Sequence, residues 1–263
     1  MRTLRKYAVI ARVHLQNALA YRASVASRLC FYTLFIFVFM NLWRAIYREG
    51  DVHGYTLPQI IWYLVVTELV MFGCNTGVYG QMNEDVRSGA IAYQLNRPVH
   101  YLLYHFAGAV GHMAINLTFF GAAAVALGLA FAGPLTGLRA AMLPFWLLSL
   151  GMGVSLSYFF HMLIGLSAFV LEDNVAFYLI YQKLVFMLGG FLPVEFLPEW
   201  LQVIARNLPF SYVAWAPARL FVDFSWPLFW QLVPRQAMWL ALCVALTFTC
   251  YRGGARRLEV NGG

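Results

Sequence analysis

The sequence predicts an all-α polytopic membrane protein, with an N-terminal amphipathic helix followed by six transmembrane helices. Residues 98–138 and residues 140–171 contain no Asp, Glu, Lys or Arg. About 20 apolar residues cross the ~30 Å hydrocarbon core of a bilayer as a helix, whereas a soluble domain cannot bury runs of this length. Hydrophobic residues make up 62% of the chain and charged residues 11%. A soluble domain has about 25% charged residues, so the chain is expected to cross a membrane several times.

Residues 2–22 have the pattern of an amphipathic helix that precedes the first span. At about 100° per residue, one face of this helix is apolar and the opposite face is basic. A basic amphipathic helix is expected to lie in the membrane interface, with its arginines toward lipid phosphates. The apolar face contains Leu4, Tyr7, Ala8, Ala11, Leu15, Ala18 and Leu19, and the polar face contains Arg2, Arg5, Lys6, Arg12 and Gln16.

Six apolar segments, separated by charged or turn-forming residues, are long enough to be read as spans. The stretch at residues 193–234 is interrupted by proline and is too amphipathic to cross the membrane cleanly. It is therefore placed outside the spans, before the last one. The predicted spans cover about residues 24–47, 58–81, 101–131, 140–171, 175–191 and 236–251.

The distribution of basic residues predicts the orientation. Six spans place both termini on the same side of the membrane. With the termini cytoplasmic, the inner segments hold 11 Lys and Arg residues and the outer segments hold six. The positive-inside rule therefore favours cytoplasmic termini, with residues 193–234 outside. Because the basic residues lie at span ends and not in one groove, they predict contact with membrane lipid and no nucleic-acid partner.

Two ionisable residues, Glu68 and Lys183, fall within predicted spans. Placing either charge at membrane depth costs at least about 3 kcal/mol on insertion scales, so each is expected to face a partner or a hydrated cavity. One interpretation places both residues on a substrate path or gate. The other is that they neutralise each other or a neighbouring chain, and the sequence leaves both interpretations open.

The polar segment at residues 83–98, between the second and third spans, is a second candidate site. Its acidic residues at the start and its arginine at the end suit the dipole of a short helix, and its proline ends that helix. Such a helix on the cytoplasmic face could dock a soluble partner, and a push on it would tilt both neighbouring spans. An ordinary loop is the alternative. The residues that define the segment are Glu84, Asp85, Arg87, Gly89, Arg97 and Pro98.

The sequence excludes the common mechanism of ATP hydrolysis for this chain alone. A P-loop needs a lysine after a glycine-rich turn, because the ammonium group must reach the β- and γ-phosphates. Lys6 and Lys183 are the two lysines of the chain, and neither follows a Gly-x4-Gly turn. No histidine is followed by glutamate, so the HExxH zinc motif is also absent. We expect no cofactor and no metal to be bound by this chain.

An intramembrane serine protease is the enzymatic alternative. Ser155 lies in the fourth span, and His112 with Asn116 in the third span loosely matches the rhomboid pattern. A serine nucleophile needs a base within hydrogen-bond reach. His161 follows Ser155 by six residues, about 240° around the same helix, so the two side chains diverge. This geometry disfavours the enzymatic interpretation.

The order of three features resembles the permease subunits of type-2 ATP-binding-cassette exporters. The similarity covers nearly the whole chain and is greatest to bacterial permeases of about this length, which are encoded with an ATPase and often with a second, divergent permease. The features are the basic N-terminal helix with six spans, the inner segment with Ser88-Gly89-Ala90-Ile91 and Leu95-Asn96-Arg97-Pro98, and the outer stretch with Gly189-Gly190-Phe191-Leu192-Pro193, Leu197-Pro198-Glu199-Trp200-Leu201 and Asn207-Leu208-Pro209-Phe210.

The resemblance implies a transmembrane subunit of an ATP-driven exporter in the bacterial inner membrane. Two permease chains, identical or divergent, would form an alternating-access pathway, and two ATP-binding subunits holding ATP and Mg would dock beneath them. Residues 83–98 would be the coupling helix. Residues 193–210 would form paired re-entrant helices at the outer mouth, in the segment that contains Pro193, Glu195, Pro198 and Glu199.

Two other classes remain as alternatives, the intramembrane enzyme and a channel or scaffold subunit. An associated ATPase would distinguish the exporter from both. The 22 Phe, 15 Tyr and 8 Trp residues suit an amphipathic or lipid-like cargo. Aromatic residues that face lipid or lie at the membrane interface explain the same composition equally well.

Overall fold

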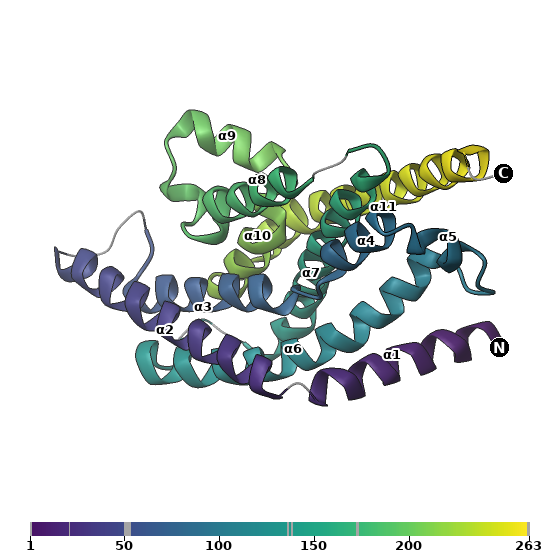
Figure 1. Ribbon diagram of the computed structural model, residues 1–263. Coiled ribbons are helices and arrows are strands. Elements are labelled where there is room, and N and C mark those ends of the chain that lie inside the picture. The colour runs from purple at the N-terminus through teal and green to yellow at the C-terminus, as the bar shows by residue number, and fades with distance from the viewer. Residues whose placement is uncertain are drawn as a thin grey trace.

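The computed structural model describes residues 2–20, 22–49, 54–135, 137, 139–171 and 174–261, and the secondary-structure elements of these residues are all helices. Most of the long helices run along one direction of the molecule, and α1 begins and α11 ends at the end that carries α5 (Figure 1). The principal helices are α1 (Arg2–Ala20), α2 (Arg22–Ile46), α3 (Leu57–Gly73), α4 (Val78–Arg87), α5 (Ala90–Leu95), α6 (Tyr101–Ala132), α7 (Leu143–Leu166), α8 (Val175–Val185), α9 (Glu199–Asn207), α10 (Ser211–Val222) and α11 (Trp226–Asn261).

Several helices are long and apolar enough to cross a membrane, as predicted, but the number six is not confirmed. The predicted fifth span corresponds to Val175–Gly190, which is shorter than 18 residues. At about 1.5 Å per residue this segment reaches less than the ~30 Å of the hydrocarbon core. Five segments of the described residues meet the length and composition of a span: Ala23–Ile46, Leu57–Arg87, Tyr101–Ala132, Ala140–Phe169 and Trp226–Ala255.

The predicted second span, residues 58–81, is broken in its last third. Helix α3 ends at Gly73, and α4 begins at Val78 after Gly77, whose φ of 71° is left-handed. The break frees backbone carbonyls that need other donors at this depth. Arg28 Nη2 donates to Phe72 O over 2.8 Å, and Asn116 Nδ2 donates to Asn75 O over 3.1 Å. Arg28 lies in the first half of α2, and its guanidinium points inward to α3.

The last helix begins earlier than predicted. The sequence placed the start near Gln236 because of Pro234, whereas α11 begins at Trp226 and continues through that proline. Proline leaves only the carbonyl four residues earlier without its helical donor, so a helix held by its neighbours can continue. Gln236 is fully buried inside the bundle. Its Nε2 donates to Ser149 O and Tyr212 O over 3.0 and 2.9 Å, joining α11 to α7 and α10.

Helix α10 lies in the centre of the fold, although it belongs to the stretch predicted to be amphipathic. Nearly all of its residues are buried, and it packs against α3, α7 and α11. The chain reaches it from α8 through the π-helical turn η4 (Phe186–Gly190). Gly189 has φ 130°, which favours glycine, and Tyr63 Oη donates to its carbonyl. This turn reverses the chain toward η5 (Val194–Phe196) and α9.

The predicted N-terminal helix is present as α1, which packs along α6 (Figure 1). Tyr7, Ala11 and Leu15 are partly buried, as their place on the predicted apolar face requires. Val9 and Val13 are 53% and 46% exposed beside the arginines, so the polar face is mixed. The position of α1 in the membrane interface stays a prediction.

Candidate functional site

The segment at residues 83–98 is not one short helix. Helix α4 extends through Glu84 and Asp85 to Arg87, so the acidic residues lie near the end of α4 and not at the start of a separate helix. The predicted match to the helix dipole is therefore wrong. Gly89 causes the division, because its φ of 73° is left-handed and starts the separate six-residue α5.

Helix α5 is fixed on one side and open on the other. Ile91 is 1% exposed and anchors the helix to the core, whereas Tyr93 is 70% exposed. The guanidinium of Arg97 lies 5.1 Å from the centre of the Tyr93 ring, in a cation–π contact. Tyr93 and Arg97 therefore form one exposed aromatic and cationic surface, followed by the exposed Pro98. Tyr93 was not among the residues that defined this segment in the sequence, so its exposed ring was missed.

The predicted charged contacts of this segment divide into two groups. Glu84 and Arg87 are exposed at the end of α4 and free to meet a partner. Asp85 instead turns inward and accepts a hydrogen bond from Tyr101 Oη over 2.9 Å. His105 Nε2 lies 3.5 Å from the same carboxylate, without hydrogen-bond geometry. Asp85 thus joins α4 to the start of α6 rather than pointing outward.

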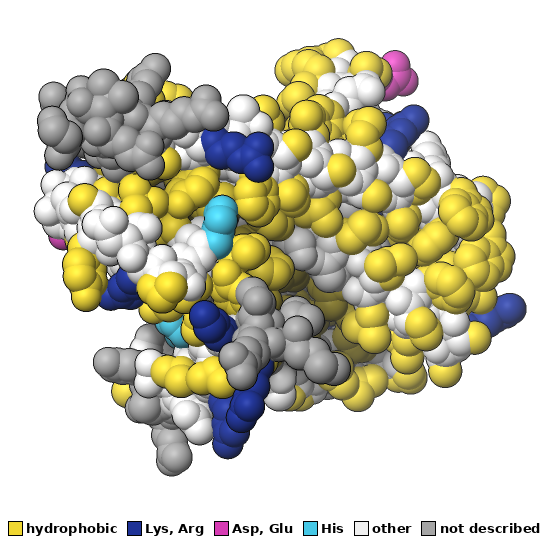
Figure 2. Space-filling model, turned by 90° about the vertical axis from the view of Figure 1, so that its right-hand side faces the viewer, with side chains coloured by type: hydrophobic (Ala, Val, Ile, Leu, Met, Phe, Trp, Pro, Cys, Tyr) yellow, Lys and Arg dark blue, Asp and Glu magenta, His cyan; other side chains and the backbone are white. Residues whose placement is uncertain are grey.

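The end of the molecule around α5 is rich in basic side chains. Figure 2 views this end and shows Lys and Arg side chains between apolar ones, with few Asp and Glu side chains. A basic rim of this kind is what the positive-inside rule describes for a cytoplasmic face. Exposed basic residues of α1, the end of α4, the α5–α6 loop and the C-terminal half of α11 include Arg5, Lys6, Arg12, Arg87, Arg97 and Arg252.

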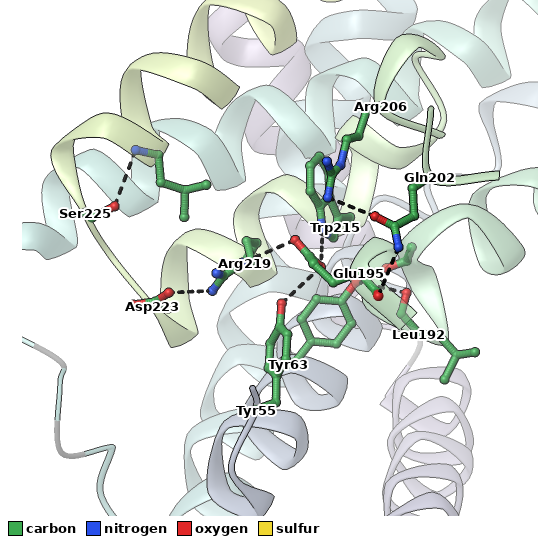
Figure 3. Close-up of polar contacts among 12 residues, drawn as sticks. Tyr55, Tyr63, Leu192, Glu195, Gln202, Arg206, Trp215, Arg219, Asp223 and Ser225 are labelled. Atoms are coloured by element: carbon green, nitrogen blue, oxygen red, sulfur yellow. Dashed lines mark hydrogen bonds and ion pairs between the residues drawn. The ribbon is translucent and has the colours of Figure 1, made fainter. Parts of the chain in front are cut away.

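A second polar cluster surrounds Glu195, one of the residues predicted in the outer segment (Figure 3). Its Oε2 accepts hydrogen bonds from Tyr55 Oη over 3.1 Å and from Trp215 Nε1 over 3.2 Å. Its Oε1 lies 3.4 Å from Arg219 Nε. Arg219 also pairs with Asp223, its Nη1 lying 2.9 Å from Oδ2. The carboxylate of Glu195 therefore connects η5 to α10 and to Tyr55, which lies just before α3.

The environment of this cluster favours its charged network. Burial, reinforced by the negative charge of Glu195, raises the pKa of Tyr55 far above its usual value, so the phenol stays a donor. Burial alone would lower the pKa of Arg219. The neighbouring Tyr55, Glu195 and Asp223 outweigh burial, and the pKa of Arg219 is raised. The guanidinium also lies 5.2 Å from the centre of the Tyr55 ring.

The other residues predicted in the outer segment lie around this cluster without joining it. Pro193 is buried where the chain leaves the π-helical turn, and Pro198 and Glu199 are exposed at the start of α9. Gln202 of α9 donates to the backbone carbonyls of Glu195 and Leu197 over 3.2 and 2.8 Å. It therefore holds α9 against η5.

A family model described as ABC-2 family transporter protein matches residues 29–262. The chain belongs to this family. It is the membrane-embedded permease subunit of an ABC-2 type transporter, an integral membrane component that is not itself catalytic. Permeases of the ABC-2 family generally work with ATP-binding subunits. No curated protein matches the chain.

The two ionisable residues predicted to lie within spans, Glu68 and Lys183, do not meet in this ABC-2 permease. Glu68 is 4% exposed in the middle of α3. Lys183 is exposed on α8, and the ion pairs found among the described residues do not include one between the two. Mutual neutralisation within one chain is therefore wrong. The remaining predictions, a substrate path or a neighbouring chain, stay predictions.

Among the described residues, the hydrogen bond of Ser155 does not go to a base, as a serine nucleophile would require. Ser155 Oγ donates to Gly151 O over 2.7 Å, within its own helix. Asn116 is occupied by the broken end of α3, as described above. The described residues also contain no group of three His, Cys, Asp or Glu side chains that could hold a metal ion.

Sequence reasoning missed a polar joint at the α5 end of the ABC-2 permease. Tyr79 Oη of α4 donates to Asn174 Oδ1 over 3.0 Å. Asn174 lies between the predicted fourth and fifth spans, residues 140–171 and 175–191, next to residues 172 and 173, which lie outside the described residues. An asparagine between two apolar segments is the signal that could have pointed to this joint, because a buried amide needs partners.

Proposed function

We propose that this permease forms half of the alternating-access pathway of an ATP-driven exporter, energised by separate ATP-binding subunits. The family supports a transmembrane transporter subunit. The sequence contains no phosphate-binding loop, so conformational work must reach this chain through contacts with a partner. ATP and Mg would be held by that partner.

The surface formed by Tyr93 and Arg97 carries the proposal. A six-residue helix is too short to be stable alone, but here Ile91 fixes it while Tyr93 stays 70% exposed. Exposed aromatic and arginine side chains are the residue types that dominate protein interfaces. The flanking Glu84 and Arg87 add charges of both signs. We infer that this surface enters a groove of the ATP-binding subunit.

The orientation follows from the same surface. An ATP-binding subunit works where ATP is present, so the α5 end would face the cytoplasm of a bacterial inner membrane. The basic rim around α5 supports this orientation. The Glu195 cluster and α9 would then lie on the outer side, as re-entrant helices at the mouth. A second permease chain, the same or divergent, would complete the pathway.

The proposal is tested by Tyr93→Ala and Arg97→Glu in the complex purified in mild detergent. Loss of an interface anchor costs about 2 kcal/mol or more, equivalent to about a 30-fold loss of affinity. We expect each variant to release the ATP-binding subunit, or to keep it while ATP hydrolysis no longer drives transport. Membrane insertion should be normal.

Trp200→Ala is the matched control, because Trp200 is 65% exposed on α9 and is also an aromatic side chain. It should leave co-purification of the ATP-binding subunit unchanged. If Tyr93→Ala and Arg97→Glu both match the wild type in co-purification and in coupled transport, α5 is not the docking element. If the wild-type chain retains no ATP-binding subunit, the exporter assignment itself fails.

A further inference from the structure

The buried amide of Asn174 joins the end of α7, the start of α8 and the first turn of α4. Its side chain is fully buried between the end of α7 and the start of α8. Its Nδ2 donates to Ile164 O over 2.8 Å and lies 3.2 Å from Ser167 Oγ. Its Oδ1 accepts the hydrogen bond of Tyr79. The donor and acceptor ends of one amide are therefore used for different helices.

A second contact runs parallel to this hydrogen bond. The rings of Tyr79 and Tyr178 stack with centroids 4.5 Å apart and planes 4° from parallel. The backbone N–H of Tyr178 donates to Asn174 O over 3.3 Å, within the first turn of α8. Tyr79 therefore contacts both the residue that begins α8 and the first turn of that helix.

Helix α4 is firmly attached to α7 on the same side. A Cβ added at Gly165 would lie 2.9 Å from Met82 Cβ, so the two helices touch without room for a side chain. Helix α4 also packs on η3 (Ser167–Phe169), the turn that follows α7. A displacement of α4 must therefore carry the end of α7 with it.

Away from this joint, helix α8 is attached along one face only, where Tyr181 contacts the rings of Phe160 and Phe210. Phe177, Leu179 and Ile180 are each at least 50% exposed. Tyr181 Oη donates to Ser157 Oγ over 2.8 Å on the inner face. From its joint with α4, α8 runs toward α9 and ends at the turn before the Glu195 cluster (Figure 1). Few attachments allow it to move as one piece.

We propose that Asn174 and Tyr79 are positioning residues that transmit movement of α4 and α5 to α8, and through it to the Glu195 end of the permease. This inference rests on the proposed function, because the movement begins where the ATP-binding subunit docks. The two residues bind no substrate. They fix the angle between α4 and α8, so that the two helices change position together.

The test is Tyr79→Phe in the full complex with its ATP-binding subunit. The substitution removes one hydroxyl and keeps the stacked ring. Met187 is 62% exposed in η4, the turn that follows the far end of α8, and serves as reporter, as Met187→Cys in a background where the exposed Cys30 and Cys250 are serine. The labelling rate of this cysteine by a maleimide is compared without nucleotide and after trapping with ATP and vanadate.

We expect the wild-type complex to change its labelling rate on trapping. Loss of one hydrogen bond between the helices should reduce this change about 2- to 10-fold in Tyr79→Phe. Asn174→Ala should reduce it at least as much. Co-purification of the ATP-binding subunit and the rate without nucleotide should stay at wild-type values, which a merely structural defect would not allow.

Tyr178→Phe is the matched control. It removes a hydroxyl from the other ring of the same stack. Among the described residues, that hydroxyl accepts a hydrogen bond only from Gln182 Nε2 of the same helix, over 2.8 Å. It should keep the full change on trapping. If Tyr79→Phe responds like Tyr178→Phe, the inference is overturned and the proposed function stands. If the wild-type rate does not respond to ATP and vanadate, the proposed function fails together with the inference.

Discussion

The Glu195 cluster is predicted to hold the outer segment together, and Glu195→Gln measures how strongly. The substitution keeps size and shape and removes the charge. Hydrogen bonds to a charged group contribute about 1.5–3 kcal/mol and neutral ones about 0.5–1.5 kcal/mol. The bonds from Tyr55 and Trp215 each change from the first class to the second, which costs about 1 kcal/mol each.

The ion pair with Arg219 adds little to this sum. The Arg219 and Glu195 side chains are 19% and 24% exposed, and their contact of 3.4 Å lacks hydrogen-bond geometry. Arg219 also keeps Asp223 in the variant, so no charge is left alone. We therefore expect a total loss of about 2 kcal/mol. This corresponds to a fall of about 4–8 °C in the Tm of the purified complex.

Glu199→Gln is the control, because Glu199 is exposed at the first turn of α9 and has no hydrogen bond or ion pair among the described residues. Removing its charge from the helix N-terminus costs about 0.5 kcal/mol, or about 1–2 °C. Equal falls in Tm for Glu195→Gln and Glu199→Gln would refute the anchoring role of Glu195.

A double-mutant cycle gives a second, independent test of the same cluster. Tyr55→Phe removes the donor to the charged Glu195 and should cost about 1.5–3 kcal/mol in the wild type. In the Glu195→Gln background the cost should be smaller by about 0.5 kcal/mol or more, because the two residues interact directly. Additive effects would show that the hydrogen bond between them does not stabilise the fold.

Two further predictions concern packing and orientation. Gly111→Ala should lower the Tm by several degrees, because the new Cβ would collide with the backbone carbonyl of Ala11 in α1. Gly121→Ala is the control and should leave the Tm unchanged, because the space around Gly121 is open. Equal effects of the two substitutions would contradict the packing of α1 on α6. The orientation is tested in intact cells with an impermeant maleimide, in the background where Cys30 and Cys250 are serine. The maleimide should label Trp200→Cys and should not label Arg97→Cys. The reverse pattern would overturn the proposed orientation.

The continuous apolar helices could be predicted closely from the sequence. Residues 101–131 and 24–47 were predicted as spans, and α6 and α2 differ from these bounds by at most two residues. Long apolar runs fix such helices because the membrane requires every backbone group to be satisfied within the segment. For α1 the predicted face was right at Tyr7, Ala11 and Leu15 and wrong at Ala8, which is exposed.

The polar clusters could not be predicted, because each depends on residues far apart in the sequence. Tyr55 and Glu195 are 140 positions apart, and Arg28 and Phe72 are 44 apart. From the sequence, Glu195 was named only as a member of the outer segment. Arg219 entered only the count of basic residues that predicted the orientation. Local pattern assigns a residue to a helix or a turn, but only the packing of α3, α10 and η5 selects its partners.

The break between α3 and α4 changes how a push on α5 can act. The sequence suggested one long lever on each side of α5, with the second span tilting as a whole. In the structure, α3 packs mainly on α10 and α6, whereas α4 packs on α7. Arg28 and Asn116 satisfy the carbonyls at the break, so α3 does not need the helix to continue. We infer that movement from α5 passes through α4 to the end of α7 and to α8, and not along α3, so that it reaches the Glu195 cluster through α8 and the turn at Gly189.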